Sequence, residues 1–394
     1  MARQVFLLEG ARTAFGSFGG GLTGVNATEL GTVAAKAALE RAGVDPGDVD
    51  NVVFGNVIGG HNGAAYIARH IGLDSGVPQS TPALTVNRLC GSGLQAVVSA
   101  TKDILLGDSE VGLAGGAENM SQTPYLLRGA RFGMRMGDGK AVDLLSEVLT
   151  DCRGNLPMGI TAENLAKRYN ISREEQDEFA LLSHQRAAAA RASGRLAKEI
   201  APVTIKGRKG DTVIEHDEHI RPDTSMESLA KLKPAFDREG TVSAGNASGI
   251  NDGAGAVLVA SAEAVQQHGY NPLARVVSYG VAGVDPAYMG IGPVPAIRQA
   301  LAAAALDAKD IALFEVNEAF ASQYISVEKE LDLPRDRTNV NGGAIALGHP
   351  VGASGARLLL TLAYELRERG DRYGVASLCI GGGQGIAIVI EAIR

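Results

Sequence analysis

The sequence predicts an α/β fold built from two similar halves, and two patterns lead to this prediction. The first is an alternation, along all 394 residues, of short apolar strand-like runs with Ala-rich helical runs. The second is an internal repeat, in which residues 38–54 (ALERAGVDPGDVDNVVF) match residues 300–316 (ALAAAALDAKDIALFEV) at a constant offset. Each copy reads as the end of a helix, an acidic turn and the start of an apolar strand. Such a repeat indicates two related units, at roughly 1–120 and 270–394.

The repeat continues through the next helix of each half. The motif TVN at residues 85–87 precedes a Gly-rich segment and a helix, and NVN at residues 339–341 does the same in the second half. Both helices are expected to end near a Gly-Asp pair, at residues 107–108 and 370–371, before an apolar strand. The uncharged stretch 373–390 contains five glycines and one glutamine, which favours strand–turn–strand over a membrane-spanning helix.

An irregular insertion lies between the two halves. Ser172 and Glu175 have the spacing of a capping box, so a helix is expected from there to about Ala192, with Gly194 as its stop. The stretch 205–240 carries seven basic and eight acidic residues, which indicates solvated loops rather than a basic binding surface.

Composition excludes several classes of protein. Glycine accounts for 51 of 394 residues, where roughly 7% is ordinary, yet the chain has no G-X-Y period and only 14 prolines. The excess therefore indicates tight turns and places where the backbone approaches a ligand, not collagen. A net charge of −7 and the absence of Trp oppose a nucleic-acid-binding role.

The cysteines and the ends of the chain bear on the compartment. Cys90, Cys152 and Cys379 are far apart and form no CxxC pair, which argues against a disulfide framework and a structural zinc site. The first residues lack the apolar core of a secretory signal, and the last three are no peroxisomal signal. A cytoplasmic location is expected.

Cys90 is the candidate nucleophile. Residues 82–90 read as a strand, residues 91–93 (GSG) as a sharp turn, and the residues that follow as a helix with one apolar face. Cys90 is therefore expected at a helix N-terminus, where the partial positive charge favours the thiolate. The adjacent glycines leave room for a substrate, as in a nucleophile elbow. Without this context a lone Cys is more simply a small buried hydrophobe.

His349 is the candidate base. It lies in a Gly-rich turn, residues 341–357, which occupies in the second half the place that the turn of Cys90 occupies in the first. Pseudo-twofold symmetry would bring both turns over one pocket, and a Cys–His pair is a common way to activate a thiol. The remaining histidines are interpreted as ordinary polar or solvated loop residues without a metal: His61, His70, His184, His216, His219 and His268.

A third Gly-rich turn, residues 379–385 (CIGGGQG), begins with Cys379. Glycines this dense leave backbone N–H groups free to face an oxyanion, as acyl-transfer intermediates require. Asn317 ends the repeated strand of the second half, where it can orient a water or a side chain. An Asn at a strand end is also a common turn residue, so its position alone assigns no role.

Four segments together resemble the thiolase family: those around Cys90, His349 and Cys379, and residues 246–261 (NASGINDGAGAVLVAS). The resemblance covers essentially the whole chain, with the motifs in the right order. It implies the thiolase fold: two similar α/β domains with mixed sheets covered by helices, plus an inserted loop domain. The implied boundaries are 1–120 with 250–270 for the N-terminal domain, 121–249 for the loop domain and 271–394 for the C-terminal domain.

The resemblance also implies catalytic roles. Cys90 matches the acylated nucleophile and His349 its base, which with a water held by Asn317 would form one oxyanion hole. Cys379 matches the acid/base that moves protons at the substrate Cα or the leaving CoA sulfur. The backbone N–H groups of Cys90 and Gly381 would form a second oxyanion hole.

Substrate contacts and assembly follow from the same resemblance. The positions that match substrate and CoA contacts are Leu149, Met158, Arg221, Ser228, Phe236, Ala244, Ser248, Met289, Ala319 and Phe320. Residues 125–139 resemble the loop through which many thiolases assemble from homodimers into homotetramers. Thiolases specialised for acetoacetyl-CoA often have His where this chain has Pro157, and Pro-Met-Gly looks more like 3-ketoacyl thiolases that accept longer chains.

The implied activity is reversible ping-pong Claisen chemistry on CoA thioesters through an S-acyl-cysteine. Either two acetyl-CoA give acetoacetyl-CoA and CoA, or 3-ketoacyl-CoA and CoA give acyl-CoA and acetyl-CoA. No metal or redox cofactor is expected, since the thioester acidifies its own α-carbon and CoA is a substrate; no nucleic acid or membrane partner is expected either. Two alternatives stay open. The first is a decarboxylating ketosynthase, but such enzymes usually lack a cysteine in the last Gly-rich turn, where this chain has Cys379. The second is an inactive acyl-CoA- or lipid-binding relative, which should have lost some of the candidate catalytic residues, whereas this chain has them all.

Overall fold

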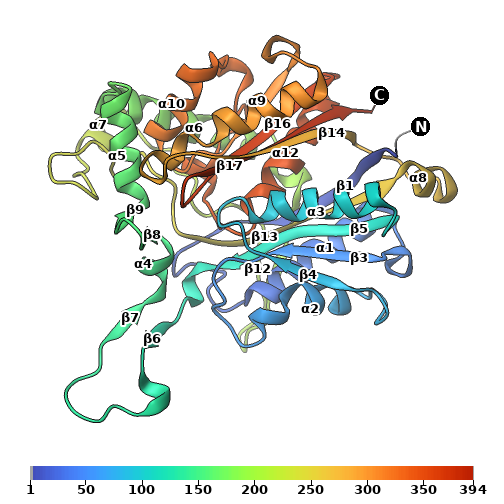
Figure 1. The fold of residues 1–394 in the computed structure, drawn as a ribbon, viewed down its shortest axis with the longest axis horizontal. Helices are drawn as coiled ribbons and strands as arrows, with labels where there is room; N and C mark the ends of the chain where they lie inside the picture. Colours follow the sequence, from blue (N-terminus) through green and yellow to red (C-terminus); the bar gives the residue numbers. More distant parts are fainter. Residues whose placement is uncertain (1–2, 394) are drawn as a thin grey trace.

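The computed structural model describes residues 3–393, and each half of the chain contributes one portion of a mixed sheet (Figure 1). The strands of the N-terminal half are β1 (Val5–Thr13), β3 (Asn51–Gly55), β4 (Ala83–Val86), β5 (Val111–Asn119) and β13 (Asn251–Ser261). Those of the C-terminal half are β14 (Ala274–Gly283), β15 (Leu313–Val316), β16 (Tyr373–Ile380) and β17 (Gln384–Ala392). The expected strand–turn–strand at 373–390 is confirmed by β16 and β17.

The two portions are hydrogen-bonded into one sheet. Within residues 3–393 this sheet has 11 strands, in the order β15-β16-β17-β14-β1-β13-β5-β3-β4, with β2 (Gly16–Ser17) beside β13 and β10 (Ile200–Ala201) beside β1. In each half the repeated strand pairs in parallel, β3 with β4 and β5, and β15 with β16. The pairs from β16 through β17, β14, β1 and β13 to β5 are antiparallel, and the short β10 is parallel to β1. The halves join through β1 and β14, which pair over Val5–Leu7 and Ala274–Val276.

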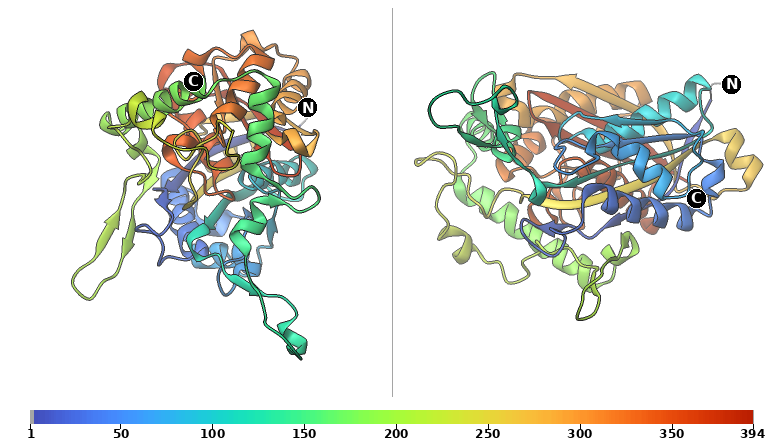
Figure 2. Two further views of the ribbon diagram at one scale, coloured as in Figure 1. Left: turned by 90° about the vertical axis from the view of Figure 1, so that its left-hand side faces the viewer. Right: turned by 90° about the horizontal axis from the view of Figure 1, so that it is seen from below.

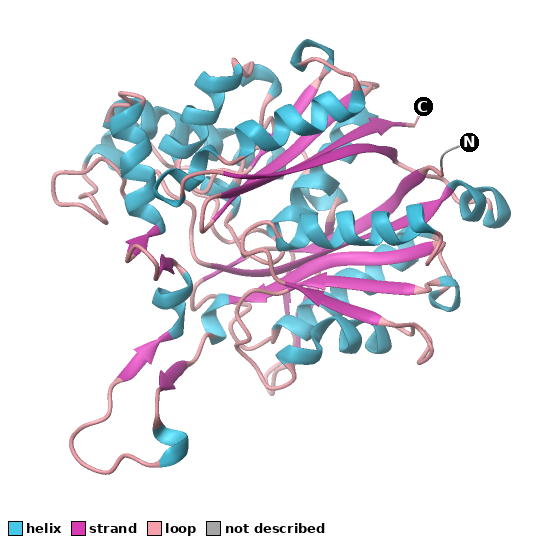
Figure 3. Ribbon diagram, in the orientation of Figure 1, coloured by secondary structure: helices cyan, strands magenta, loops and turns pink. Residues whose placement is uncertain are grey.

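Helices cover both faces of the sheet (Figure 3). Outside the insertion, the main helices are α1 (Ala27–Ala42), α2 (Ile67–Asp74), α3 (Ser92–Leu106), α8 (Ala262–His268), α9 (Pro293–Ala304), α10 (Ala321–Leu331) and α12 (Ser354–Arg369). The apolar faces of α3 and α12 share one core with strands of both halves, so these two helices lie between the two portions of the sheet. In contrast, α1 and α2 cover the outer face of the N-terminal half, and α9 and α10 that of the C-terminal half.

The helices α3 and α12 meet at their N-termini, and glycines permit the close approach. A Cβ on Gly355 would lie 2.2 Å from the backbone nitrogen of Leu94, and one on Gly93 would lie 2.8 Å from the carbonyl oxygen of Gly352. No larger residue fits there without movement of the backbone. This crossing brings the turn before α3 next to the turn before α12, as the internal repeat predicts.

The insertion packs over one end of both halves and extends two arms (Figures 1 and 2). Its elements are β6 (Tyr125–Leu127), β7 (Ala141–Asp143), α4 (Leu144–Val148), β8 (Thr150–Asp151), β9 (Leu156–Pro157), α5 (Met158–Arg168), α6 (Arg173–Ala192), β11 (Val203–Ile205), β12 (Thr212–Ile214) and α7 (Met226–Ala230). The paired strands β6 and β7 form the base of one arm, and β11 and β12 form the other. The predicted capping box of Ser172 and Glu175 begins α6.

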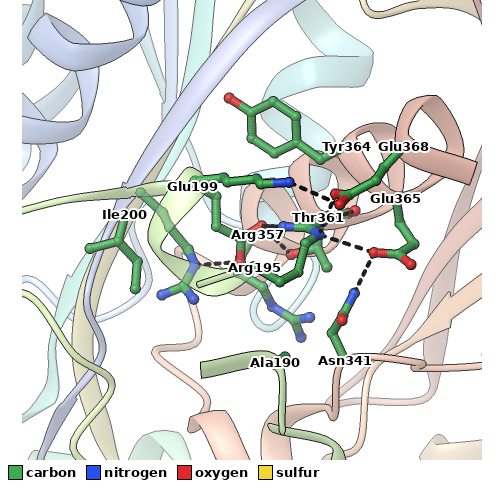
Figure 4. A network of polar contacts seen from close by, with 12 residues as sticks. Ala190, Arg195, Glu199, Ile200, Asn341, Arg357, Thr361, Tyr364, Glu365 and Glu368 are labelled. Carbon is green, nitrogen blue, oxygen red and sulfur yellow. Dashed lines mark hydrogen bonds and ion pairs between the residues drawn. The ribbon is translucent and has the colours of Figure 1, made fainter. Parts of the chain in front are cut away.

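A buried polar network fixes the segment after α6 to α12 (Figure 4). Arg195 Nε donates to Glu365 over 3.0 Å, and Asn341 Nδ2 donates to the same carboxylate over 2.7 Å. Glu199 accepts from the hydroxyl of Thr361 over 2.9 Å. Because buried charges require partners, this network holds the insertion in one position on the second half. Among residues 3–393 there is no helix with both the length and the apolar character needed to cross a membrane.

Candidate active site

Cys90 lies in a tight turn directly before α3. The expected strand ends already at Val86, because side chains bend the backbone there: Asn87 Oδ1 accepts from the N–H of Leu89 over 2.9 Å, and Ser92 Oγ accepts from that of Arg88 over 2.8 Å. Leu89 adopts a left-handed conformation with φ of 46°. A non-glycine residue in this region is uncommon and marks a backbone held by its surroundings.

The thiol of Cys90 is protonated in the resting protein. Burial raises its pKa to about 11 from the ordinary 9.0, although the N–H groups of Gly381 and of Cys90 itself hydrogen-bond the sulfur and lower it. Desolvation thus outweighs the favourable partial charges at the helix N-terminus and around the sulfur. The sulfur needs a base before it can attack. The same two N–H groups are those expected to form the second oxyanion hole.

His349 is oriented to be that base. Its ring Nδ1 lies 2.6 Å from Ser354 Oγ, and this hydroxyl donates to the carbonyl of Pro350 over 2.9 Å. Since Ser354 uses its own proton there, Nδ1 carries the ring proton and Nε2 keeps its lone pair. Asn317 Nδ2 lies 3.4 Å from Nε2, and Asn251 Oδ1 accepts from the backbone N–H of His349 over 2.9 Å.

The charge state of His349 suits a proton acceptor. Burial lowers its pKa to about 3, with a further lowering by the positive charge of Arg357, so the ring is neutral at physiological pH. Asn317 Oδ1 is buried and has no hydrogen-bond partner among the residues that the structure describes. A buried acceptor without a partner destabilises the folded protein, so this oxygen is well placed to accept a hydrogen bond from the expected water.

Cys379 is the last residue but one of strand β16 and lies near Cys90. It is fully buried among apolar side chains that include Met289 and Phe320, and burial together with the nearby Cys90 raises its pKa. The following turn is open to glycine only, with φ of 75° at Gly382 and 81° at Gly383. The structure therefore brings the three predicted Gly-rich turns together.

One cavity of about 390 Å³ opens onto Cys90 and His349. Of the positions predicted to contact substrate, these line it: Leu149, Met158, Arg221, Phe236, Ala244, Ser248, Met289, Ala319 and Phe320. Ser228 lies outside the lining, and its hydroxyl hydrogen-bonds the backbone of Ser225 in the capping box that begins α7, so its contact with CoA stays a prediction. Within the described part of the chain, no three His, Cys, Asp or Glu side chains are grouped as for a metal ion.

Several lining residues were not predicted: Met120, Gly159, His219, Ala235, Ser243, Ala247, Gly249, Ile250 and Val351. The interpretation of His219 as a solvated loop residue was wrong, since its ring lines the cavity and stacks on His184 at 6.5 Å. Burial lowers the pKa of both imidazoles to about 4. The polar composition of residues 205–240 concealed this site, although Ile220, a buried neighbour, was a local signal of burial.

A half-buried Cys90 and a buried His349, with backbone N–H groups at the sulfur and an adjoining apolar cavity, define an enzyme that transfers acyl groups through a thiol nucleophile. Residues 5–263 match the family described as thiolase, N-terminal domain, and residues 270–392 match thiolase, C-terminal domain. The chain belongs to the thiolase family, and the predictions of family and fold are confirmed.

Individual relatives span the whole chain. The mitochondrial 3-ketoacyl-CoA thiolase of Homo sapiens is 54% identical over 100% of this chain and 99% of its own length. An acetyl-CoA acetyltransferase of Cupriavidus necator is 50% identical over 98% of this chain and 99% of its own. The crystal structure of the human mitochondrial thiolase in complex with CoA has a TM-score of 0.97 and 53% identity, covering 100% of this chain and 99% of that one. The names of these relatives favour a thiolase over a decarboxylating ketosynthase or an inactive acyl-CoA-binding protein.

The prediction of a cytoplasmic location was wrong by this comparison. The relatives from Homo sapiens, Pongo abelii and Mus musculus, each 54% identical to this chain, are named as mitochondrial. The prediction rested on the lack of an apolar secretory signal. Such a signal bears on secretion only, whereas mitochondrial targeting uses amphipathic, Arg-rich segments.

Proposed function

We propose that this protein cleaves 3-ketoacyl-CoA with CoA into acyl-CoA and acetyl-CoA, and catalyses the reverse condensation. The observation that carries the proposal is the Cys90 sulfur, hydrogen-bonded by the N–H of Gly381 and opening with His349 into one cavity. Relatives named for both reactions, 3-ketoacyl-CoA thiolase and acetyl-CoA acetyltransferase, support it at 50–54% identity.

The first half of the proposed reaction acylates Cys90. His349 Nε2 takes the thiol proton, and the sulfur attacks the 3-keto carbon of the substrate. The N–H groups of Cys90 and Gly381 hold the resulting oxyanion. The bond between C2 and C3 then breaks, and the electron pair on C2 takes a proton from Cys379, which releases acetyl-CoA. His349 and the water on Asn317 stabilise the enolate oxygen of that product.

The second half returns the acyl group to CoA. The thiol of an incoming CoA gives its proton to the Cys379 thiolate and attacks the acyl carbon. The Cys90 sulfur leaves and regains its proton from His349, so every proton is returned to its starting position. Because the thioester carbonyl delocalises the charge on C2, we propose that the reaction needs no metal or redox cofactor.

A direct test is to locate the covalent intermediate. Incubation with acetyl-CoA followed by peptide mass spectrometry is expected to find one acetyl group on Cys90. Cys152, which is exposed and does not line the cavity, serves as the internal control and should stay unmodified. A stable acetyl group on Cys152 or Cys379 and none on Cys90 would contradict the proposed nucleophile.

We also propose that the protein forms homodimers that assemble into homotetramers through the arm at 125–139. The support is the arm's exposed apolar side chains, with Phe132 88% and Met136 98% accessible in the single chain. Replacing both by Ser should shift the mass measured by light scattering from tetramer to dimer. An unchanged mass would show that the arm is not the contact.

A further inference from the structure

His219 presents unused hydrogen-bonding groups to the cavity. Its ring lines the cavity wall, and neither ring nitrogen makes a hydrogen bond with any residue between 3 and 393. Burial lowers the pKa of this imidazole to about 4, with a further lowering by the charge of Arg221. The ring is therefore neutral, with one N–H donor and one nitrogen acceptor. Most of the remaining wall is apolar, so a free polar group here is a point of recognition.

The position of His219 lies between the mouth of the cavity and the reacting groups. Arg221, two residues along the chain, also lines the cavity but is exposed, whereas His349 at the inner end is buried. On the inner side, a Cβ on Gly249 would lie 2.7 Å from Cε1 of His219 and 2.8 Å from Oδ1 of Asn251. That oxygen accepts the backbone N–H of His349 over 2.9 Å. The segment from Gly249 to Asn251 therefore lies between His219 and the turn of His349.

The neighbours of His219 hold it in place without occupying its polar atoms. Its ring stacks on His184, whose Nδ1 accepts the backbone N–H of Arg221 over 3.2 Å. Gly249 leaves room for the edge of the ring, because a Cβ at this position would lie 2.7 Å from Cε1 and would displace the ring. A ring held by stacking beside a glycine that just admits it loses little conformational entropy when it binds a ligand.

A CoA thioester has a matching group at this depth. Its phosphates suit a guanidinium at the mouth, and its thioester must reach Cys90. Between them runs the pantetheine arm, which has two secondary amides, each with one N–H donor and one carbonyl acceptor. We propose that His219 binds the pantetheine arm of the CoA substrates through a hydrogen bond to one of these amides. This inference rests on the proposed function and adds a positioning contact to it.

The experiment compares ligand binding by His219→Phe, which keeps a ring but removes both polar atoms, and His219→Gln, which keeps a donor and an acceptor. Calorimetry on the full-length protein should give a CoA dissociation constant about three- to tenfold weaker for His219→Phe, the usual range for one neutral hydrogen bond. His219→Gln should recover part of that loss. His216→Phe, on an exposed histidine of the same loop, is the matched control and should bind as the unaltered protein does.

Binding of pantetheine, which lacks the nucleotide of CoA, shows whether His219 contacts the pantetheine arm. The loss caused by His219→Phe should be the same factor for pantetheine as for CoA, and in thiolysis it should raise KM with kcat changed less than twofold. An unchanged CoA dissociation constant in His219→Phe, or a loss seen with CoA but absent with pantetheine, overturns the inference. Absence of thiolysis by the unaltered protein would instead contradict the proposed function, while the calorimetric comparison still tests the contact.

Discussion

Burial shifts the pKa values of Cys90 and His349 in opposite directions, and both shifts favour the neutral forms. In the resting site, transfer of the thiol proton to the imidazole is therefore unfavourable. It becomes favourable only as negative charge moves onto an oxygen that the N–H groups of Cys90 and Gly381 can hold. The proton transfer is thus coupled to the presence of a substrate carbonyl, which protects a resting cysteine from other electrophiles.

Replacing Cys379 distinguishes its role as an acid/base from the role of Cys90 as the nucleophile. Cys379→Ala removes the proposed proton donor to C2 but leaves the sulfur of Cys90 and its base in place. Acetylation of Cys90 by acetyl-CoA should continue, while turnover falls by about 10²–10⁴, the usual contribution of a general acid/base. Mass spectrometry of the intermediate and steady-state thiolysis measure the two effects. Near-normal turnover would require another acid/base.

The lowered pKa of His349 predicts a flat pH profile for acylation. The base works as the neutral imidazole, so an ordinary histidine with a pKa of 6.5 would lose rate as the pH falls below that value. With the pKa lowered to about 3, the loss is displaced to far lower pH. The rate of Cys90 acetylation should stay within about twofold from pH 7 to pH 5. A tenfold fall per pH unit below 6.5 would contradict a buried, neutral His349.

At the level of elements, the crossing of α3 and α12 determines where both catalytic turns lie. Gly355→Ala would place a Cβ 2.2 Å from the backbone nitrogen of Leu94 and push the helices apart. We expect a loss of about 1–3 kcal/mol in the free energy of unfolding by urea, as for other overpacked sites. Gly24→Ala is the control, because that Cβ would meet no atom within 4 Å. Equal stability of both variants would contradict a crossing that requires glycine.

Local patterns of the sequence predicted the elements well, and tertiary burial explains what they missed. The repeat and the Gly-rich turns located Cys90 and His349, because turn chemistry is local. The raised pKa of Cys90 depends on desolvation by distant segments, and so does the placement of His219 in the wall. Ser228 belongs to the capping box that begins α7, and its contact with CoA stays a prediction.

The whole molecule is needed to form the site. Cys90 comes from the first half, His349 from the second and Phe236 from the insertion, and all three line one cavity. The polar network around Arg195 and Glu365 holds the insertion against α12, so the cavity wall is fixed to the helix that follows His349. The residue boundaries of the three domains stay predictions, but the catalytic pair cannot be assembled from one half.

The acyl end of the cavity also draws on the whole molecule and predicts the preferred substrate length. Beside Cys90 lies an apolar cluster formed by Ile58, Met120, Leu145 and Val351, from both halves and the insertion. Pro157 ends β9 directly before α5 and does not line the cavity, so no ionisable side chain from that position faces the acyl group.

Because the acyl wall is apolar, each further buried methylene can contribute up to about 0.8 kcal/mol of binding. Acetoacetyl-CoA should be a substrate, and kcat/KM for a six-carbon 3-ketoacyl-CoA should be at least as high. Thiolysis of both at one CoA concentration measures the ratio. A preference of more than about tenfold for acetoacetyl-CoA, or some 1.4 kcal/mol in transition-state binding, would mean that the apolar cluster closes the cavity directly behind C4.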